Sequence, residues 1–307
     1  MSGTYSPSLS QGQKQLFQDN FLSLVQQRKS LLEGAGVLVY LPSKGKTNNL
    51  GRIGKIELSE VSTRNPDKVY GDYDLDNRQL TKRRFTKTIT IDKLYDINEL
   101  IADPTSPILV ELDNAVQRLK DRIIAAAAGG AVLVGAPDAT PSSISAATDG
   151  VITVAATGGL TSASVDSVIQ TFINNDVPED VRRGAVFCMT GKEHAALMAD
   201  DTFVNSLYVD DKPVTVGKLQ AVEGLKVVTF AGTDSVITVA DPILEEASTV
   251  RTNLVLCPKS VAISLELGDL SVDKNPNKVN SNDITIDYWI NAMRVEGARV
   301  IKVTTTI

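Results

Sequence analysis

The chain has 307 residues, of which 42% are hydrophobic, and its formal net charge is −6. A chain of this size can form one large domain or two smaller ones, and it has enough apolar residues to fold without disulfides or a metal. Its most apolar run, residues 123–136, is shorter than the roughly 18 to 20 residues of a membrane span. The N-terminus also lacks the basic start and apolar core of a secretory signal. We therefore expect a protein that is made in the cytoplasm and has no membrane partner.

The charge is unevenly distributed along the chain. Residues 44–93 contain twelve Lys or Arg and seven Asp or Glu, a net charge of +5, so the remainder carries −11. A basic segment on an acidic chain could bind nucleic acid, or it could pair with acidic surfaces on other copies of the same protein. Composition alone leaves both alternatives open.

The first elements are predicted by spacing. Apolar residues recur every three or four positions through residues 11–33, which predicts an amphipathic helix that ends at Gly34 and Gly36. The β-branched and aromatic residues at 37–41 then predict a short strand. After them, residues 42–81 are polar and charged, and turn sequences interrupt short extended pieces. A structureless loop of about forty residues is rare in a compact domain, so we predict a long hairpin that projects from the body and is stabilised from outside its own domain.

Two strong elements follow. Residues 85–91 alternate in character and are mostly β-branched, which predicts a strand. A short helix or turn is expected at 92–102. Residues 107–128 then place apolar side chains along one stripe, which predicts a helix about 33 Å long, capped by Ser106 and ended by Gly129-Gly130. A helix of that length can be the backbone of a domain.

The second half reads as an α/β unit. Residues 131–158 are small and turn-rich, and we expect loops and short strands there. Helices are predicted at 164–174 and 192–201, and strands at 184–189, 226–230, 235–240, 253–257 and 261–265. Two last extended segments, 283–293 and 298–305, are joined at Glu296-Gly297 and predict a hairpin.

Catalytic patterns fail along the whole sequence. The chain has one histidine, His194, and two distant cysteines, Cys188 and Cys257. These support neither a nucleophilic triad nor a zinc site, and we expect two buried, reduced thiols. A phosphate-binding loop at 184–193 is rejected, because six residues separate its glycines where four are required and Glu193 replaces the Ser or Thr that would hold magnesium. We predict no catalytic, cofactor-binding or metal site, and therefore not an enzyme.

The order of these parts resembles that of the tailed-bacteriophage major capsid proteins with the Hong Kong 97 type of fold. The residue-level likeness is confined to about residues 83–131, with weaker echoes at Arg64 and at Gly297 with Arg299. The matching pieces are Arg83-Arg84, Ile91-Asp92 with Asp96, Asp103-Pro104-Thr105-Ser106, and Ala115, Arg118, Asp121, Ile124 and Ala127.

The resemblance implies an α+β fold in five parts. These are an N-terminal arm and helix (1–41), a long β-hairpin called the E-loop (42–91) and the spine helix region of the peripheral domain (92–130). A mostly axial domain with interleaved peripheral elements (131–265) follows, and C-terminal strands return to the peripheral domain (266–307).

The resemblance also implies a function. The chain would assemble as hexamers and pentamers into the icosahedral head of a tailed phage, in the host bacterial cytoplasm, and enclose double-stranded DNA. From the net charge of −6 we expect this DNA to make loose, non-specific contact with an acidic inner surface. A portal protein and a scaffolding protein are implied partners, the latter separate because the chain begins almost directly with its arm helix. A decoration protein is left open.

Arginine forks suit interface carboxylates, so the charged residues of the arm and helix are predicted to form inter-subunit contacts. They are Arg52, Arg64, Arg78, Arg83, Arg84, Asp92, Asp96, Arg118 and Asp121. The alternative is a nucleic-acid-binding protein that uses the basic hairpin 44–93, with Tyr70, Tyr73 and Phe85 as stacking platforms. The aspartates between them would repel phosphate, which disfavours it. An α/β enzyme without a recognisable motif is a third alternative.

Overall fold

A computed structural model describes residues 27–58, 60, 62–64, 67–68, 71, 73–92, 105–135, 140–200, 221–222, 224–232, 244, 250–278 and 281–306. It divides into two compact units, each built from several segments of the chain. The first unit takes residues 1–30, 84–119 and 266–289, and the second takes 31–83, 120–265 and 290–307. Of the helices in the described residues, none is both long and apolar enough to cross a membrane.

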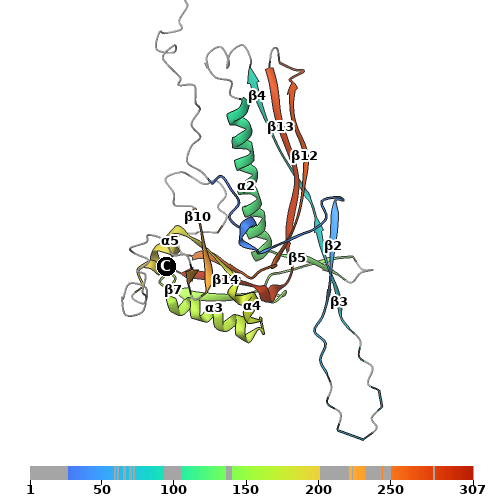
Figure 1. Cartoon of the computed structure of the whole chain (residues 1–307), viewed down its shortest axis with the longest axis vertical. Helices are drawn as coiled ribbons and strands as arrows, with labels where there is room; N and C mark the ends of the chain where they lie inside the picture. The colour runs from blue at the N-terminus through green and yellow to red at the C-terminus, as the bar shows by residue number, and fades with distance from the viewer. Residues whose placement is uncertain are drawn as a thin grey trace, which may run out of the picture. The chain divides into compact units, whose positions relative to one another are not determined.

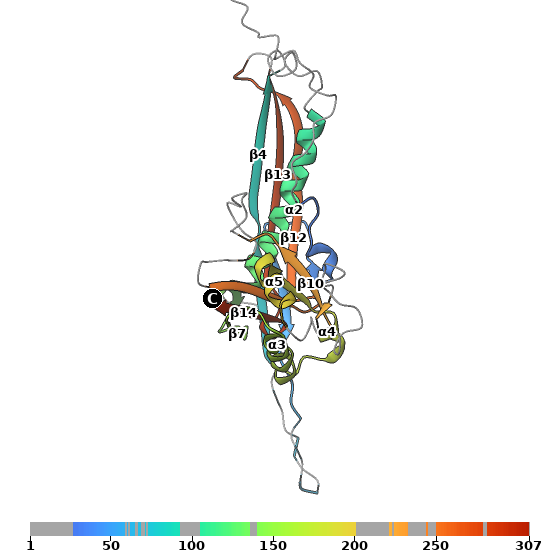
Figure 2. The same ribbon diagram turned by 90° about the vertical axis from the view of Figure 1, so that its left-hand side faces the viewer.

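In the first unit a helix covers one face of a sheet. Strands β12 (Val261–Lys274), β13 (Ser281–Arg294) and β4 (Arg83–Asp92) lie side by side in that order, and helix α2 (Thr105–Gly129) runs along them (Figures 1 and 2). Ile91, Leu112 and Ile284 form the buried centre between helix and strands. The apolar side of the strand and the apolar stripe of the helix, which the sequence predicts separately, therefore face each other in the structure. Because α2 begins at Thr105, Ser106 lies inside the helix and not before it.

The main sheet of the second unit has six strands in the order β7-β14-β11-β8-β10-β9. Helices α3 (Ser162–Asn174), α4 (Glu179–Arg183) and α5 (Gly191–Met198) belong to the same unit. Every residue of β8 is buried, and Phe187 and Met189 share a core cluster with Phe172 of α3. The strands are β7 (Ile152–Thr157), β14 (Val300–Thr306), β11 (Val250–Leu256), β8 (Val186–Thr190), β10 (Leu225–Phe230) and β9 (Ala221–Val222).

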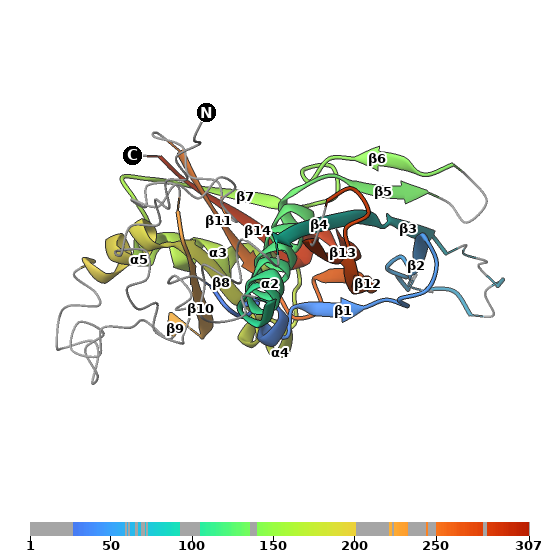
Figure 3. The same ribbon diagram turned by 90° about the horizontal axis from the view of Figure 1, so that it is seen from above.

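The predicted hairpin forms a second sheet of this unit. Strand β2 (Thr47–Ile53) pairs antiparallel with β3 (Leu75–Thr81), from Thr47 opposite Thr81 to Ile53 opposite Leu75. Strands β5 (Val132–Gly135) and β6 (Ser142–Ile144) continue the sheet beside β3 (Figure 3). Every described residue from 54 to 74 is exposed, so the far part of the hairpin has no cover from its own chain in the described residues.

The helix predicted at 11–33 does not reach its expected end. Residues 11–26 lie outside the described residues, and residues 27–32 are not helical, with only a single 3-10 turn at Glu33–Ala35. The reason is that the backbone N–H groups of Leu31 and Leu32 donate to the carboxylate of Asp121, at 2.9 and 3.2 Å, and not to helical carbonyls. The strand expected at 37–41 is confirmed as β1 (Leu38–Tyr40).

The hairpin predicted for the last two strands is wrong. Strand β13 lies between β12 and β4, whereas β14 pairs with β7 and β11 in the other sheet. The chain turns between them through a 3-10 turn, Gly297–Arg299, where a Cβ on Gly297 would lie 1.9 Å from the carbonyl oxygen of Asp149. Both strands have the expected extended pattern, but that pattern does not say which strand is the partner. The segments predicted at 93–102 and 235–240 lie outside the described residues.

Candidate functional site

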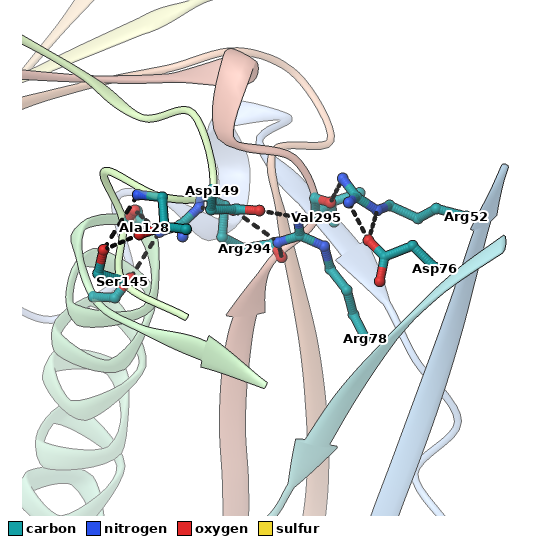
Figure 4. A network of polar contacts seen from close by, with 10 residues as sticks. Arg52, Asp76, Arg78, Ala128, Ser145, Asp149, Arg294 and Val295 are labelled. Atoms are coloured by element: carbon teal, nitrogen blue, oxygen red, sulfur yellow. Dashed lines mark hydrogen bonds and ion pairs between the residues drawn. The ribbon is translucent and has the colours of Figure 1, made fainter. Parts of the chain in front are cut away.

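Three charged side chains meet under the base of the hairpin. Arg78 of β3 and Arg294 at the end of β13 both bind Asp149, which lies in the turn between β6 and β7 (Figure 4). Arg78 Nη1 lies 3.0 Å and Arg294 Nε 2.7 Å from Asp149 Oδ2, and a second contact joins Arg78 Nη2 to Oδ1. Both arginine side chains are 0% exposed and the aspartate is 5% exposed. We call these three residues the hairpin anchor.

The anchor also caps the long helix. Arg294 Nη1 donates to the carbonyl oxygens of Ala128 and Gly130, at 2.9 and 2.8 Å, where α2 ends. A cation at a helix C-terminus satisfies the last carbonyls and is favoured by the helix dipole. Arg78 Nη1 in turn donates to the carbonyl oxygen of Arg294 at 2.8 Å. The hairpin strand β3 is thus joined to the end of α2 through buried polar contacts.

The turn that carries Asp149 is held by its own backbone. The N–H of Asp149 donates to the carbonyl of Ser145, and the N–H of Gly150 donates to the carbonyl of Ala147. Gly150 has a φ of +88°, in the left-handed region that glycine tolerates best. These local contacts hold the backbone of the turn from which Asp149 extends toward the two arginines.

A second contact ties the neighbouring strand of the hairpin. Arg52 of β2 donates to Asp76 of β3 and, through Nη1, to the carbonyl oxygen of Val295 at 3.0 Å (Figure 4). This pair is partly exposed, with 30% and 26% of the side chains accessible. Both hairpin strands are therefore bonded to the backbone where β13 ends, β3 through Arg78 to Arg294 and β2 through Arg52 to Val295.

The hairpin anchor contains two positive charges and one negative charge. Burial raises the pKa of Asp149. The hydrogen bonds from Arg78 and Arg294 outweigh this effect, so the pKa lies below its ordinary value. One carboxylate serves two guanidinium groups, and Arg78 Nε and Arg294 Nη2 find no acceptor in the described part of the chain. Breaking such a buried pair leaves an uncompensated charge, which makes the carboxylate essential to the cluster.

The first unit has a polar pair of its own. Arg84 of β4 binds Asp287 of β13, and hydrogen bonds from Arg84 and then Thr86 lower the pKa of Asp287. Farther along the same strands Thr88 meets Thr285 at 3.0 Å, and Thr90 donates to Asp283 at 2.7 Å. These contacts line the face of the sheet opposite the buried Ile91 and Ile284, because side chains alternate along a strand.

The nine predicted contact residues thus lie in several places. Arg52, Arg78 and Arg84 have carboxylate partners within the chain, whereas Arg64 and Arg83 are exposed. On α2, Arg118 Nη1 lies 3.4 Å from the carbonyl oxygen of Gln27, and Asp121 binds the backbone of Leu31 and Leu32. Asp96 and the side chain of Asp92 lie outside the described residues. Contact with a neighbouring subunit stays a prediction for all nine.

Sequence reasoning missed the partners. Asp149, Arg294 and Asp287 bind the predicted arginines, yet each is distant in sequence from its partner and carries no motif. It also missed Glu193, a fully buried carboxylate that accepts Arg251 Nη1 at 3.0 Å and the backbone N–H of Leu160 at 2.9 Å. Glu193 therefore connects α5 to the backbone just before α3.

The chemistry available at these sites is structural. Burial raises the pKa of Cys188 above its ordinary value and that of Cys257 to about 12, so both thiols stay protonated near neutral pH. Both cysteines are free and buried, as expected. Within the described ranges no group of His, Cys, Asp and Glu could hold a metal ion. The charged groups act as ties between elements.

Comparison with known proteins indicates a phage capsid protein over most of the chain. A family model described as phage capsid protein matches residues 9–307. The structure is similar to the head structure of Helicobacter pylori bacteriophage KHP40, with a TM-score of 0.70, 10% identity and coverage of 99% of both chains. The mature capsid of bacteriophage PhiM1 gives 0.67, 13% identity and coverage of 95% of this chain and 91% of that one. The capsid of cyanophage Pam1 gives 0.66, 13% identity and 98% of both. No curated protein matches.

The resemblance inferred from residues 83–131 is therefore confirmed, together with the α+β fold of the Hong Kong 97 type. The family consists of structural capsid proteins and is not known to be enzymatic, in agreement with the sequence. Because the family model covers nearly the whole sequence, the chain belongs to the phage capsid protein family.

Proposed function

We propose that this capsid protein assembles as hexamers and pentamers into the icosahedral head of a tailed phage and that the head encloses double-stranded DNA. The family and fold support a major capsid protein of the virion. The proposal adds that the protein forms hexamers and pentamers and that the head encloses DNA.

One observation carries the proposal: the hairpin combines a fixed base with an uncovered far end. Its base is held by the buried anchor, while Ile56 is 71% and Leu58 98% exposed. An isolated two-stranded hairpin is only marginally stable in water, so it gains much from a further surface to pack on. A neighbouring copy in a closed shell supplies such a surface.

The inter-subunit contacts of the charged residues belong to the same proposal. Arg64 and Arg83 support it best, because they are exposed and therefore accessible to a neighbour. Arg52, Arg78 and Arg84 already have carboxylate partners in their own chain, and a neighbour would have to share or replace those pairs.

The remaining partners follow from assembly into a head. We include a scaffolding protein and a portal protein, with a decoration protein as an optional addition, and place assembly in the host cytoplasm. The net charge of −6 favours loose, non-specific contact with packaged DNA, because an acidic surface repels phosphate and leaves DNA free to slide.

The alternative, nucleic-acid binding through residues 44–93, has less support. Three of its arginines are paired with carboxylates, and a paired guanidinium contributes less to phosphate binding.

Negative-stain electron microscopy of the purified protein tests the proposal. We expect shells or capsomers. Small oligomers of one size, with no larger particles under any assembly condition, would overturn it. Measurement of DNA affinity against salt concentration examines the alternative, since a steep salt dependence would favour nucleic-acid binding.

A further inference from the structure

The turn of the hairpin anchor contains a chemically reactive sequence. Asp149 is followed directly by Gly150, and this is the one place in the chain where an aspartate or asparagine precedes a glycine. Because glycine has no side chain to hinder its backbone, its amide nitrogen can approach the carboxyl group of the residue before it. An Asp-Gly sequence is therefore prone to conversion into isoaspartate. In this chain the aspartate concerned is the carboxylate that holds two buried arginines.

The conversion has two steps and needs no reagent other than water. In the first step Gly150 N forms a bond to Asp149 Cγ, and the carboxyl OH and the amide hydrogen leave as one water molecule. The product is a five-membered succinimide. In the second step water adds to one of the two succinimide carbonyl carbons and breaks the bond from that carbon to nitrogen. Attack at Cγ regenerates aspartate, whereas attack at the main-chain carbonyl carbon gives isoaspartate.

In the folded chain both reacting groups are engaged by hydrogen bonds. The Asp149 carboxylate accepts from Arg78 Nη1 at 3.0 Å and from Arg294 Nε at 2.7 Å, and its side chain is 5% exposed (Figure 4). The N–H of Gly150 donates to the carbonyl oxygen of Ala147 at 3.1 Å. The lowered pKa of Asp149 also keeps the carboxyl ionised, so the OH that must leave is absent near neutral pH. Attack therefore requires that the contacts of both groups break.

Exclusion of water does not protect this turn. Gly150 is exposed, and it lines a cleft of about 460 Å³ together with Asp149. Water for the second step can therefore reach the turn. The peptide that joins the two residues is also packed against other backbone, since a Cβ on Gly297 would lie 1.9 Å from the Asp149 carbonyl oxygen. The contacts of the reacting groups, and not burial of the glycine, are what slows the reaction.

We propose that Asp149-Gly150 is a covalent modification site that is closed while the hairpin anchor is formed and that reacts when the anchor opens. In isoaspartate the main chain is longer by one methylene group, and the free carboxylate is attached directly to Cα. The carboxylate can then no longer reach Arg78 and Arg294, and the turn no longer fits against Gly297. A chain that stays unfolded therefore loses the ability to rebuild the anchor. The formed anchor preserves its own carboxylate.

A comparison of the folded and the unfolded chain tests the proposal without any substitution. The native chain is incubated at neutral pH with and without denaturing urea, in water labelled with oxygen-18. After digestion, mass spectrometry with electron-transfer fragmentation measures isoaspartate at position 149. The label marks conversion that precedes digestion, because hydrolysis of the succinimide inserts one labelled oxygen. We expect conversion in urea to be at least about tenfold faster, since the folded chain reacts only through local opening. Equal rates would overturn the proposal.

Substitution of single arginines identifies the protecting contacts. Arg78→Gln removes one of the two guanidinium groups from Asp149, and we expect conversion in the folded chain to rise by at least about fivefold. Arg52→Gln is the matched control, because Arg52 binds Asp76 and the carbonyl of Val295 instead. Its rate should equal that of the native chain.

The state of each variant is checked by circular dichroism. If Arg78→Gln does not fold, Arg78→Lys replaces it, because lysine keeps the positive charge but loses the two-atom contact with the carboxylate. A folded Arg78 variant that converts no faster than Arg52→Gln would refute the protecting role of the anchor.

Refolding tests whether the change destroys the anchor. Native chains are kept in urea until part of them carries isoaspartate at 149, and they are then refolded and treated briefly with protease. We expect the chains that resist digestion to be depleted in isoaspartate at this position, because a chain without the anchor opens more readily. The same isoaspartate content before and after protease would show that the turn tolerates the change, and the proposed loss of the anchor would be wrong.

Discussion

At the scale of single residues, the anchor shows how a charged group can be buried without becoming a catalytic site. Asp149 accepts hydrogen bonds from two guanidinium groups that are themselves bonded to backbone carbonyls. Removing charges from water is costly, and only good geometry and further hydrogen bonds offset that cost. The three residues therefore depend on one another, and loss of the carboxylate should be felt by both arginines.

Replacement of Asp149 tests this dependence. Asp149→Asn keeps the shape but leaves two buried cations without a counter-charge, and we expect a loss of about 3 to 5 kcal/mol in the free energy of unfolding. Asp176→Asn is the control, because its carboxylate is 93% exposed in a weak pair and the change should stay within about 0.5 kcal/mol. Urea unfolding of the unassembled chain measures both. If both variants lost the same free energy of unfolding, Asp149 would not have the stabilising role that we assign to it.

The same carboxylate should make stability depend on acid. The pKa of Asp149 is lowered in the folded chain, so the unfolded chain takes up its proton at a higher pH. Its stabilisation is present above the ordinary carboxyl pKa of about 3.9 and is lost as the pH falls through the lowered folded value. The stability difference between the native chain and Asp149→Asn should therefore shrink below about pH 4. Unfolding curves from pH 6 to pH 3 check this, and a constant difference would refute it.

At the scale of elements, the crossing from β13 to β14 places the last strand in a different sheet from its predecessor. The crossing depends on close contact of two backbones, since the turn at Gly297 lies directly against the carbonyl of Asp149. Glycine is required here by space and not by φ. The contact holds the backbone of Asp149, a residue of the hairpin anchor, against the turn that leads into β14.

Gly297→Ala should therefore be severe. The added methyl would overlap the Asp149 carbonyl and force the backbone apart, with an expected cost of about 3 kcal/mol, at the upper end of typical overpacking effects. Gly51→Ala in β2 is the matched control, because no atom of the described residues outside its immediate chain neighbours lies within 4 Å of the position that the new methyl would take. Thermal unfolding of both variants gives the comparison. A melting temperature for Gly297→Ala equal to that of the control would show that the turn can move aside.

At the scale of the whole molecule, charge reversal at a well-chosen arginine can separate an effect on assembly from an effect on the stability of the folded chain. Arg84 binds Asp287 in its own chain, so its reversal would disturb both folding and contacts. Arg83 is exposed, and its reversal should affect assembly alone. We expect Arg83→Glu to reduce the yield of particles while the circular dichroism spectrum of the chain is unchanged.

Lys278→Glu makes the same charge change at an exposed position outside the hairpin and helix α2. Particle yield after sedimentation should fall for Arg83→Glu and stay near that of the native chain for Lys278→Glu. A similar fall in both would point to net charge as the cause, and the Arg83 contact would have to be abandoned.

Much of the fold is predictable from local patterns. The alternation at 85–91 and the apolar stripe at 107–128 predict β4 and α2, because a residue's neighbours in sequence decide which face it shares. The hairpin is also predicted locally, because the polar, turn-rich stretch 42–81 is too long for a structureless loop of a compact domain. Arg78 and Arg84 also stand out in the sequence, although only as contacts with other copies.

The sequence by itself thus determined most of the strands and helices that the structure describes, the hairpin of β2 and β3, and the capsid family. Only the tertiary structure decided that Asp149 and Arg294 hold Arg78, that Asp121 keeps the backbone of residues 31 and 32 out of a helix and that β14 leaves β13 for another sheet. The physical reason is common to all three. Periodicity reports which face of an element is apolar, whereas the partner of a strand, a backbone N–H or a buried charge is chosen by residues far away in the chain.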